Sequence, residues 1–420
     1  MPGRFLPPPG PARTLALAQL ANSIGDGAFL VTSALYFTRV VGLSPGQVGL
    51  GLTVGWAVGL LVGVPGGHAA DRRDARTVAV LLAAATGLAV AGFLLVRQPV
   101  TFLAAACLYA GCQTGLAAVR QALLARLVAP GGRTEVRARL QSVVNAGLAL
   151  GAALGGAALS ARTAGAYRLI LVLDAVAFLT AAALLCRLPT TPPAARPERG
   201  ADRLAVLRDR PYALLTGLNA VMMLYLPLLS LVLPLWVARR TAAPPWLAAG
   251  LLMVNTAAVM LAQVRVARRV VDRAGALRSL RRAGAAMVLA CGLFALSAAA
   301  GGPWAAGAIL LLGAAAQVYA EMAHGAGAWQ LSFDLAPADR HGQYQGFFGS
   351  GVPLARMLGP ALLTWLIVDG GPAGWLVFGA AYAAAAFAVS VAVRWARGSG
   401  FRHERTMICS GRGGRAAPVG

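Results

Sequence analysis

The chain has 420 residues, of which 58% are hydrophobic and only 12% are charged. A soluble domain usually carries about 25% charged residues, so this composition excludes a soluble protein of this length. The net charge of +23 is typical of nucleic-acid-binding proteins, but the 37 basic residues, all arginine, gather in the termini and in every second loop between apolar segments. That asymmetry is typical of a membrane protein, so we expect contact with lipid and no nucleic-acid partner.

Twelve apolar segments follow one another, each long enough to cross a hydrocarbon core about 30 Å thick. They cover residues 14–38, 47–69, 77–96, 100–122, 139–160, 167–186, 211–237, 244–264, 283–300, 304–333, 345–368 and 373–393. Backbone groups in lipid must find hydrogen-bond partners within their own segment, as they do in helices. The sequence therefore predicts an all-α membrane protein with twelve transmembrane helices.

The longest interruption, rich in proline and arginine, lies between the sixth and seventh segments. We predict a six-helix bundle over residues 1–187, a cytoplasmic linker over 188–210, a second six-helix bundle over 211–395, and a disordered basic tail over 396–420. The arginine distribution places both termini in the cytoplasm.

The two predicted bundles share similar stretches in the same order. The stretch LGAALGG at 150–156 in the fifth segment resembles LGPALLT at 358–364 in the eleventh. Two pseudo-symmetric halves of this kind are typical of transporters whose substrate site lies at mid-membrane between the halves.

A cluster of charges, GHAADRRDAR at residues 67–76, separates two nearly charge-free stretches. It resembles the loop 2–3 motif of the major facilitator superfamily, Gly-x-x-x-Asp-Arg/Lys-x-Gly-x-Arg, at Gly67, Asp71, Arg72 and Arg76. Asp74 stands where that motif has glycine, which weakens a turn there.

The resemblance extends over roughly residues 14–395 and implies the fold of that superfamily, with a gating contact at the cytoplasmic end of the second helix. Asp272 and Arg273, between the eighth and ninth segments, repeat the Asp-Arg pair and would belong to the same machinery. The alternative is a solvated turn whose arginines only set the topology.

Small residues recur every fourth position in the fifth segment, GLALGAALGG at 147–156, where they would let two helices pack closely. The stretch resembles the motif Gly-x-x-x-Gly-Pro-x-x-Gly-Gly of drug:proton antiporters, here of actinobacterial type, with Ala152 in place of the proline. The matching residues, with the Gly-Pro pair of the second half, are Gly147, Gly151, Gly155, Gly156, Gly359 and Pro360. The resemblance implies export, although such stripes occur in many membrane bundles.

Acidic residues inside the predicted helices are candidates for proton coupling, because a charge at the bilayer centre costs about 2.5–3.5 kcal/mol and usually faces a cavity. Gln317, Glu321 and His324 share one helix face, and we predict Glu321 as the main coupling acid with His324 as helper. The alternative for Glu321 is a hydrogen bond to a neighbouring helix. No third ligand stands near the pair, so we expect no metal.

Four other charged residues also fall inside predicted helices: Asp26, Arg120, Asp174 and Arg356. We predict a proton or substrate role for Asp26, with Arg120 as its counter-charge or else at the lipid interface. Asp174 is expected to be structural, and Arg356 to pack or snorkel.

Polar residues among apolar ones are predicted to line a substrate cavity: Asn22, Asn219, Tyr225, Asn255, Gln317 and Trp329. Such a cavity suits lipophilic or cationic small molecules. We therefore expect a drug-efflux type of secondary transporter in the inner or plasma membrane, driven by the proton gradient without a cofactor. The resemblance implies a monomer. The alternatives are an importer or facilitator of a metabolite and a receptor without transport; an enzyme is disfavoured because no catalytic cluster is visible.

Overall fold

The computed structural model describes residues 6–161, 163–191 and 205–411. In its first half two short helical turns, η2 (Tyr36–Val40) and η3 (Phe93–Leu95), extend α1 and α3. The helices of this half are α1 (Pro11–Leu35), α2 (Pro45–Arg72), α3 (Ala75–Gly92), α4 (Pro99–Leu127), α5 (Arg133–Ala161, preceded by η4, Pro130–Gly132) and α6 (Ala164–Leu185).

The second half repeats this plan with two interrupted spans. One comprises α7 (Arg210–Met223), η6 (Leu228–Val232) and α8 (Leu233–Arg240), and the other α12 (His341–Phe348), α13 (Gly351–Leu363) and η8 (Thr364–Asp369). The remaining helices are α9 (Trp246–Ala267), α10 (Arg273–Leu296, followed by η7, Ser297–Ala299), α11 (Pro303–Asp334) and α14 (Pro372–Gly411). A short turn, η5 (Ala205–Leu207), precedes α7.

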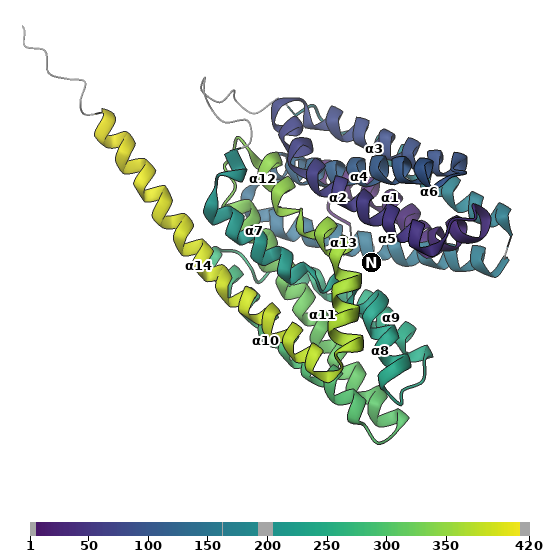
Figure 1. Ribbon diagram of the computed structural model, residues 1–420. Helices are drawn as coiled ribbons and strands as arrows, with labels where there is room; N and C mark the ends of the chain where they lie inside the picture. The colour runs from purple at the N-terminus through teal and green to yellow at the C-terminus, as the bar shows by residue number, and fades with distance from the viewer. Residues whose placement is uncertain (1–5, 162, 192–204, 412–420) are drawn as a thin grey trace, which may run out of the picture.

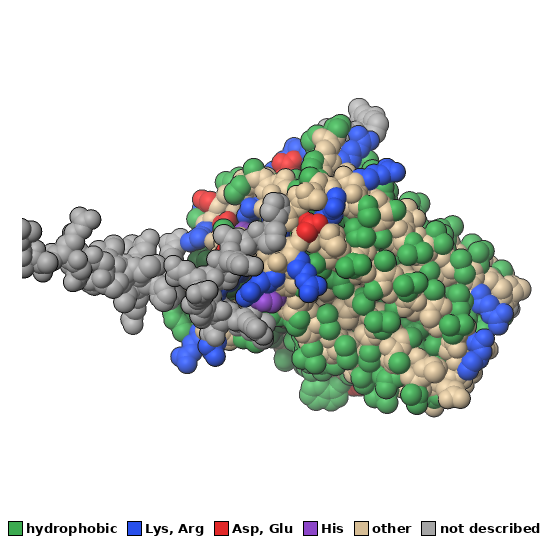
Figure 2. Space-filling model, turned by 90° about the horizontal axis from the view of Figure 1, so that it is seen from above, with side chains coloured by type: hydrophobic (Ala, Val, Ile, Leu, Met, Phe, Trp, Pro, Cys, Tyr) green, Lys and Arg blue, Asp and Glu red, His purple; other side chains and the backbone are tan. Residues whose placement is uncertain are grey.

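Eleven spans of the described residues are long and apolar enough to cross a membrane, and α1 makes the twelfth helix of the predicted architecture. Helix α1 carries the polar residues Asn22, Ser23 and Asp26 within its apolar stretch. Large hydrophobic side chains remain exposed on the outside, for example Leu61 at 73% and Leu95 at 78%, as expected for a surface that lipid covers. Figure 2 shows a broad area of hydrophobic side chains with arginines gathered beside it.

Each half has its own hydrophobic core. Phe93, Phe102 and Phe178 belong to the first core, and Trp236 and Trp375 to the second. The halves meet where α2 packs against α12 and α13, and where α5 packs against α9 and α11. Figure 1 shows the purple-to-blue first half beside the teal-to-yellow second half.

The ends of the predicted domains differ in part from the structure. Helix α14 continues to Gly411, so the structure gives a helix over 396–411 where the sequence predicted a disordered tail; residues 412–420 lie outside the described residues. Most of the predicted linker, residues 192–204, also lies outside them.

Candidate functional site

Glycines bring the two halves into backbone contact at the end of the molecule where α2 ends, here named the α2–α3 end. A Cβ atom on Gly67 would overlap the backbone of Gly342, and one on Gly346 would overlap Gly63. Because α2 and α12 touch through backbone at these points, larger side chains would force the halves apart.

Asp71 fastens this contact. Its two carboxylate oxygens accept hydrogen bonds from the backbone N–H groups of Gly342 and Gln343, each at 2.8 Å, and Arg126 lies 3.6 Å from the same carboxylate. The first N–H groups of a helix have no partner within it and carry partial positive charge, so a buried carboxylate is well placed there. One half therefore caps a helix of the other. Arg72, beside it, is exposed.

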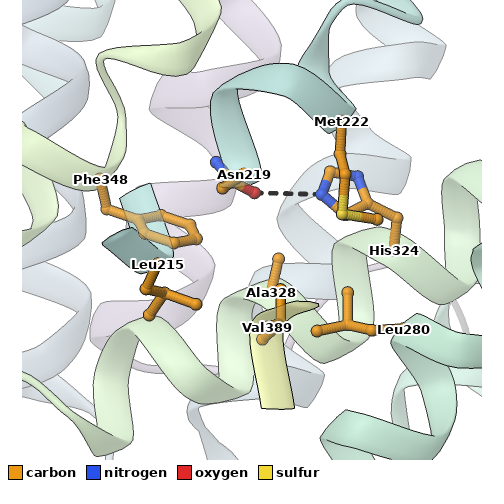
Figure 3. Close-up of a pocket in the computed structure, with 8 residues that line it drawn as sticks. All are labelled: Leu215, Asn219, Met222, Leu280, His324, Ala328, Phe348 and Val389. Atoms are coloured by element: carbon orange, nitrogen blue, oxygen red, sulfur yellow. Dashed lines mark hydrogen bonds between the residues drawn. The ribbon is translucent and has the colours of Figure 1, made fainter. Parts of the chain in front are cut away.

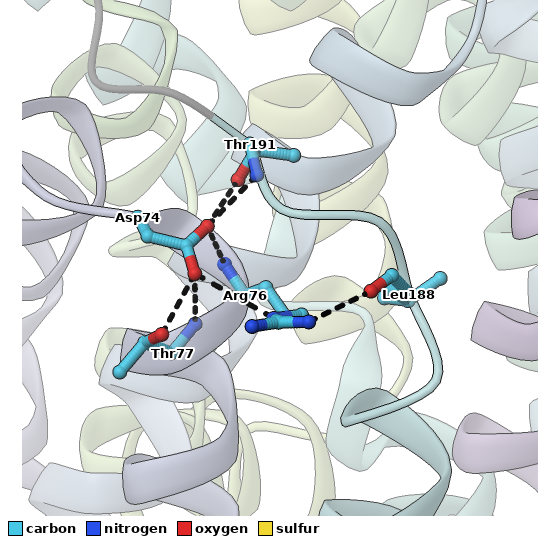
Figure 4. Close-up of polar contacts among 5 residues, drawn as sticks. All are labelled: Asp74, Arg76, Thr77, Leu188 and Thr191. Atoms are coloured by element: carbon cyan, nitrogen blue, oxygen red, sulfur yellow. Dashed lines mark hydrogen bonds and ion pairs between the residues drawn. The ribbon is translucent and has the colours of Figure 1, made fainter.

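Asp74 and Arg76 act within the first half (Figure 4). Asp74 is the N-cap of α3, with φ of −62°, and its carboxylate also accepts bonds from the N–H and hydroxyl of Thr191, both at 2.9 Å. Arg76 donates to the carbonyl of Leu188 at 3.2 Å. The turn thus needs no glycine at position 74. The sequence suggested that Asp74 weakens the turn, but Asp74 instead caps α3 and binds Thr191 in the segment after α6.

The pKa of Asp74 reflects these bonds. Burial alone would raise the pKa of this carboxyl, but hydrogen bonds from Thr77, Thr191 and Arg76 outweigh burial and hold the pKa well below its ordinary value.

Asp272 and Arg273 do not occupy positions equivalent to Asp71 and Arg72, although the sequence analysis treated the two Asp-Arg pairs as repeats. Asp272 is the N-cap of α10 and accepts from its own Gly275 N–H at 2.6 Å, which is the place Asp74 holds in the first half. Arg273 donates to the carbonyl of Asp334, also within the second half. The repeated Asp-Arg letters therefore do not mark equivalent positions.

Other polar contacts join the halves at the same end. Arg268, just after α9, pairs with Glu135 of α5 at 2.8 Å. Arg133 lies 3.4 Å from His341, and the Thr134 hydroxyl donates to Gln330. The structure thus has its α2–α3 end closed.

The glycine stripe of α5 packs on α1. Cβ atoms on Gly147, Gly151 and Gly155 would meet the α1 backbone or side chains, while the position on Gly156 is open. Gly27 of α1 completes the contact against Leu148. In the second half, Gly359 faces Pro227, and Pro360 lies inside α13.

Asp26 is the centre of a polar cluster between α1 and α4. Its carboxylate accepts from Asn22 at 2.7 Å, Gln113 at 2.9 Å and the Tyr109 hydroxyl at 3.2 Å. Arg120 donates to Asn22 at 3.0 Å, so it reaches Asp26 through that amide rather than as a direct ion pair.

Two arginines cross from one half to stack on a tryptophan of the other. The Arg356 guanidinium of α13 lies 4.4 Å from the ring centroid of Trp56 on α2, and is close enough to Asp26 to interact with its charge. Arg137 of α5 lies 5.3 Å from the ring of Trp329 on α11. Arg356 therefore belongs to the interface between the halves rather than to the lipid boundary that snorkelling would require.

Glu321 forms a second polar cluster, in the other half. Its carboxylate accepts from Asn255 of α9 at 2.9 Å and from Gln317, one turn earlier, at 3.4 Å. Both donors are neutral amides.

His324 points elsewhere. Its Nε2 donates to Asn219 of α7 at 3.0 Å, and its ring meets those of Tyr225 and Tyr382 edge-on. Its buried Nδ1 has no hydrogen-bond partner among the described residues. Among the described residues no hydrogen bond joins it to Glu321. Figure 3 shows His324 and Asn219 on the wall of a small, mainly apolar cavity.

Asp174 of α6 lies near Asp26 but is hydrogen-bonded to neither cluster among the described residues. It is fully buried against Gly25 of α1, and neither carboxylate oxygen has a hydrogen-bond partner in the part of the chain that the structure describes. A carboxyl buried without any partner is accommodated far better neutral than charged.

Several residues of the site escaped the sequence analysis. Tyr109 and Gln113, four positions apart in an apolar run, carried a signal that could have been used. Trp56, Arg137 and Tyr382 carried none, because only the packing of the two halves brings them to the site. The described residues contain no group of three or more potential metal ligands.

Comparison with known proteins gives a family and a fold. Residues 15–324 match the family model described as Major Facilitator Superfamily. No curated protein sequence matches the chain.

Three solved structures illustrate the likeness of fold. A bacterial homologue of the iron transporter ferroportin in an outward-facing state has a TM-score of 0.74 at 14% identity, over 92% of this chain and 99% of that one. The human organic anion transporter MFSD10 has a TM-score of 0.68 at 18% identity, over 90% of this chain and 100% of that one. The proton:xylose symporter XylE, bound to 6-bromo-6-deoxy-D-glucose, has a TM-score of 0.64 at 17% identity, over 90% of this chain and 94% of that one.

Proposed function

Because the chain belongs to the major facilitator superfamily, we propose that it is a secondary active transporter that exports a small, largely lipophilic molecule from the cell in exchange for protons. No enzymatic activity is part of this proposal.

Alternating access is supported by how the halves are joined. Each half has its own core, and the polar contacts between them gather at the α2–α3 end. Two rigid bundles that meet through a breakable set of contacts can rock about a central site. We place the arginine-rich α2–α3 end, and both termini, in the cytoplasm of a cell-membrane protein.

One observation carries proton coupling: among the described residues, Glu321, inside a membrane span, accepts hydrogen bonds only from the neutral amides of Asn255 and Gln317. An amide can keep such a bond whether the carboxyl is charged or neutral, so the proton can come and go with little rearrangement. No described arginine pairs with Glu321 to fix its charged form. Glu321 is therefore the proposed exchange site, and His324, bonded to Asn219, serves as a polar wall of the neighbouring cavity.

Export remains the preferred direction because the α5 glycine stripe resembles the antiporter motif, and its close packing on α1 is compatible with that resemblance. Import of a metabolite is the second candidate. The similar structures include one described as a proton:xylose symporter and one described as an organic anion transporter, so they favour no single substrate or direction.

The test uses inside-out membrane vesicles energised by respiration and a panel of fluorescent lipophilic compounds. We expect uptake that an uncoupler abolishes and that Glu321→Gln also abolishes. Asp339→Asn neutralises an acid in a loop outside the spans and is the matched control, with uptake unchanged. Uncoupler-sensitive uptake that survives Glu321→Gln would move the exchange site elsewhere, and loss of accumulated compound from energised vesicles would reverse the direction.

A further inference from the structure

Positive charge exceeds negative charge at the centre of the interface between the halves. Arg120 and Arg356 both interact with the charge of Asp26, and Arg137 lies within electrostatic range of Arg120. Arg120 and Arg356 thus share the carboxylate of Asp26, and Asp174, which also interacts with Asp26, has no arginine partner among the described residues.

These arginines are poorly satisfied by the protein itself. Arg120 donates to one amide oxygen of Asn22. The Nε of Arg137 is buried without a hydrogen-bond partner, and among the described residues no carboxylate pairs with Arg137 or Arg356. Arg120 and Arg137 are partly buried, whereas Arg356 is exposed and can meet a ligand directly. Taking a guanidinium even partly out of water without an anion costs free energy, so the arginine pair of the first half favours an anion from outside.

The two tryptophans add a surface for the rest of such a ligand. Arg356 over Trp56 and Arg137 over Trp329 each use the face of the guanidinium for stacking. Stacking leaves the N–H edge free, and that edge matches a carboxylate with two parallel hydrogen bonds. The indole rings offer flat apolar area beside it.

We propose that the interface between the halves binds an organic anion, a carboxylate on an apolar or aromatic body, with Arg356 and Arg120 holding the carboxylate and Arg137 extending the positive path toward the closed end. The proposal rests on the transport function above and changes its substrate class, since the sequence had favoured a lipophilic or cationic molecule.

Asp26 has a defined part in this arrangement. The groups that face it are Asn22 on its own helix, Tyr109, Gln113 and Arg120 on α4, and Arg356 on α13, with Asp174 of α6 behind it. An ionised Asp26 competes with the ligand carboxylate for the same guanidinium groups. Neutralising it therefore strengthens binding of an anion and weakens binding of a cation.

The test measures equilibrium binding to the purified full-length chain by calorimetry. Three probes share one ring system: 1-naphthoate, neutral 1-naphthamide and cationic 1-naphthylmethylamine. We expect naphthoate to bind at least tenfold more tightly than the amide, and the amine more weakly than both.

Variants assign the effect to residues. Arg356→Gln should weaken naphthoate at least tenfold while leaving the amide within twofold, Arg356→Lys should keep part of the affinity, and Asp26→Asn should tighten naphthoate. Arg39→Gln removes an exposed arginine at the end of η2 and should change nothing. Arg137→Gln provides a second variant if Arg356→Gln lowers the yield of folded protein.

The proposal is overturned if the amine binds as tightly as naphthoate, if naphthoate binds no better than the amide, or if both arginine variants keep full affinity. Because binding needs no proton gradient, failure of the anion site and failure of the proposed proton exchange can be told apart by the two experiments. Arginine-dependent binding without uncoupler-sensitive uptake would refute exchange and leave the anion site standing.

Discussion

Asp71→Asn should loosen the closed α2–α3 end. The change keeps the size of the side chain and removes its charge. Asp71 now satisfies the N–H groups of both Gly342 and Gln343, whereas an asparagine has one oxygen to accept and an NH₂ group that cannot accept from the other N–H.

The magnitude follows from these bonds. A hydrogen bond to a charged group contributes about 1.5–3 kcal/mol. A negative charge at a helix N-terminus adds about 0.3–1 kcal/mol, and the ion pair with Arg126 is lost as well. The closed form should lose about 2–4 kcal/mol relative to the open form, a shift of about 30-fold to about 900-fold in their ratio.

Spin labels at Arg73 and Ala338, exposed positions on either side of the contact, report the separation of the halves in a background without the five native cysteines. We expect a single short distance in the parent protein and a substantial longer component with Asp71→Asn. Asp74→Asn, three residues away, is the matched control, because Asp74 bonds only within the first half.

An unchanged distance distribution with Asp71→Asn would show that the contact does not set the closed state. A longer component with both variants would assign the effect to general damage of the loop rather than to the bonds with α12.

Three further predictions concern single residues. Gly151→Ala should lower the thermal midpoint by several degrees, since a Cβ there overlaps α1, whereas Gly156→Ala should leave the midpoint unchanged; differential scanning fluorimetry would contradict this if both behaved alike. Asp74 has a depressed pKa, so the stability it contributes is present above the ordinary pKa of about 4 and is lost only as pH falls through its lower folded value. The Asp74 bond to Thr191 should therefore be intact throughout pH 5–8, and the stability difference between wild type and Asp74→Asn should be constant there; a difference that shrinks toward pH 5 would argue against it. Asp174→Asn should fold and transport like wild type, because an amide replaces a carboxyl that is already best accommodated neutral; a loss of transport at normal stability would give Asp174 a role in proton movement instead.

The helices and their division into two halves could be predicted because hydrophobic length is a local property of the sequence. The predicted segments 47–69 and 304–333 fall inside α2 and α11. Glu321 and Gln317 were also placed on one face by their spacing, and the structure joins them by a hydrogen bond.

Partners across the interface could not be predicted in the same way. Helical spacing fixes which side of its own helix Arg356 occupies but not that α2 presents Trp56 opposite. Asp71 accepts hydrogen bonds from backbone N–H groups, and because every residue type except proline has such a group, the sequence does not reveal these partners. His324 shares a segment with Glu321, yet the packing of α7 and α14 turns it toward Asn219 and Tyr382.

The two Asp-Arg pairs show a different limit. Identical letters suggested that Asp272 repeats Asp71, but a cap is defined by where a helix begins. By that measure Asp272 is the counterpart of Asp74, since each precedes the third helix of its half. The cross-half bond of the second half is instead formed by Arg268 with Glu135.

The same pair of spans carries both the closing contact and the proposed anion site. Helix α2 supplies Asp71 at its end and Trp56 fifteen residues earlier, about 22 Å along the helix, while the span that begins with α12 supplies the capped N–H groups and, further on, Arg356. A carboxylate bound at the N–H edge of Arg356 while Arg356 stacks on Trp56 therefore acts on the two helices whose other end Asp71 holds together. Binding and closure are then mechanically joined without any additional element, and naphthoate should alter the distance between labels at Arg73 and Ala338 in the wild type but not in Arg356→Gln. An identical response in both proteins would mean that the site and the closed end move independently.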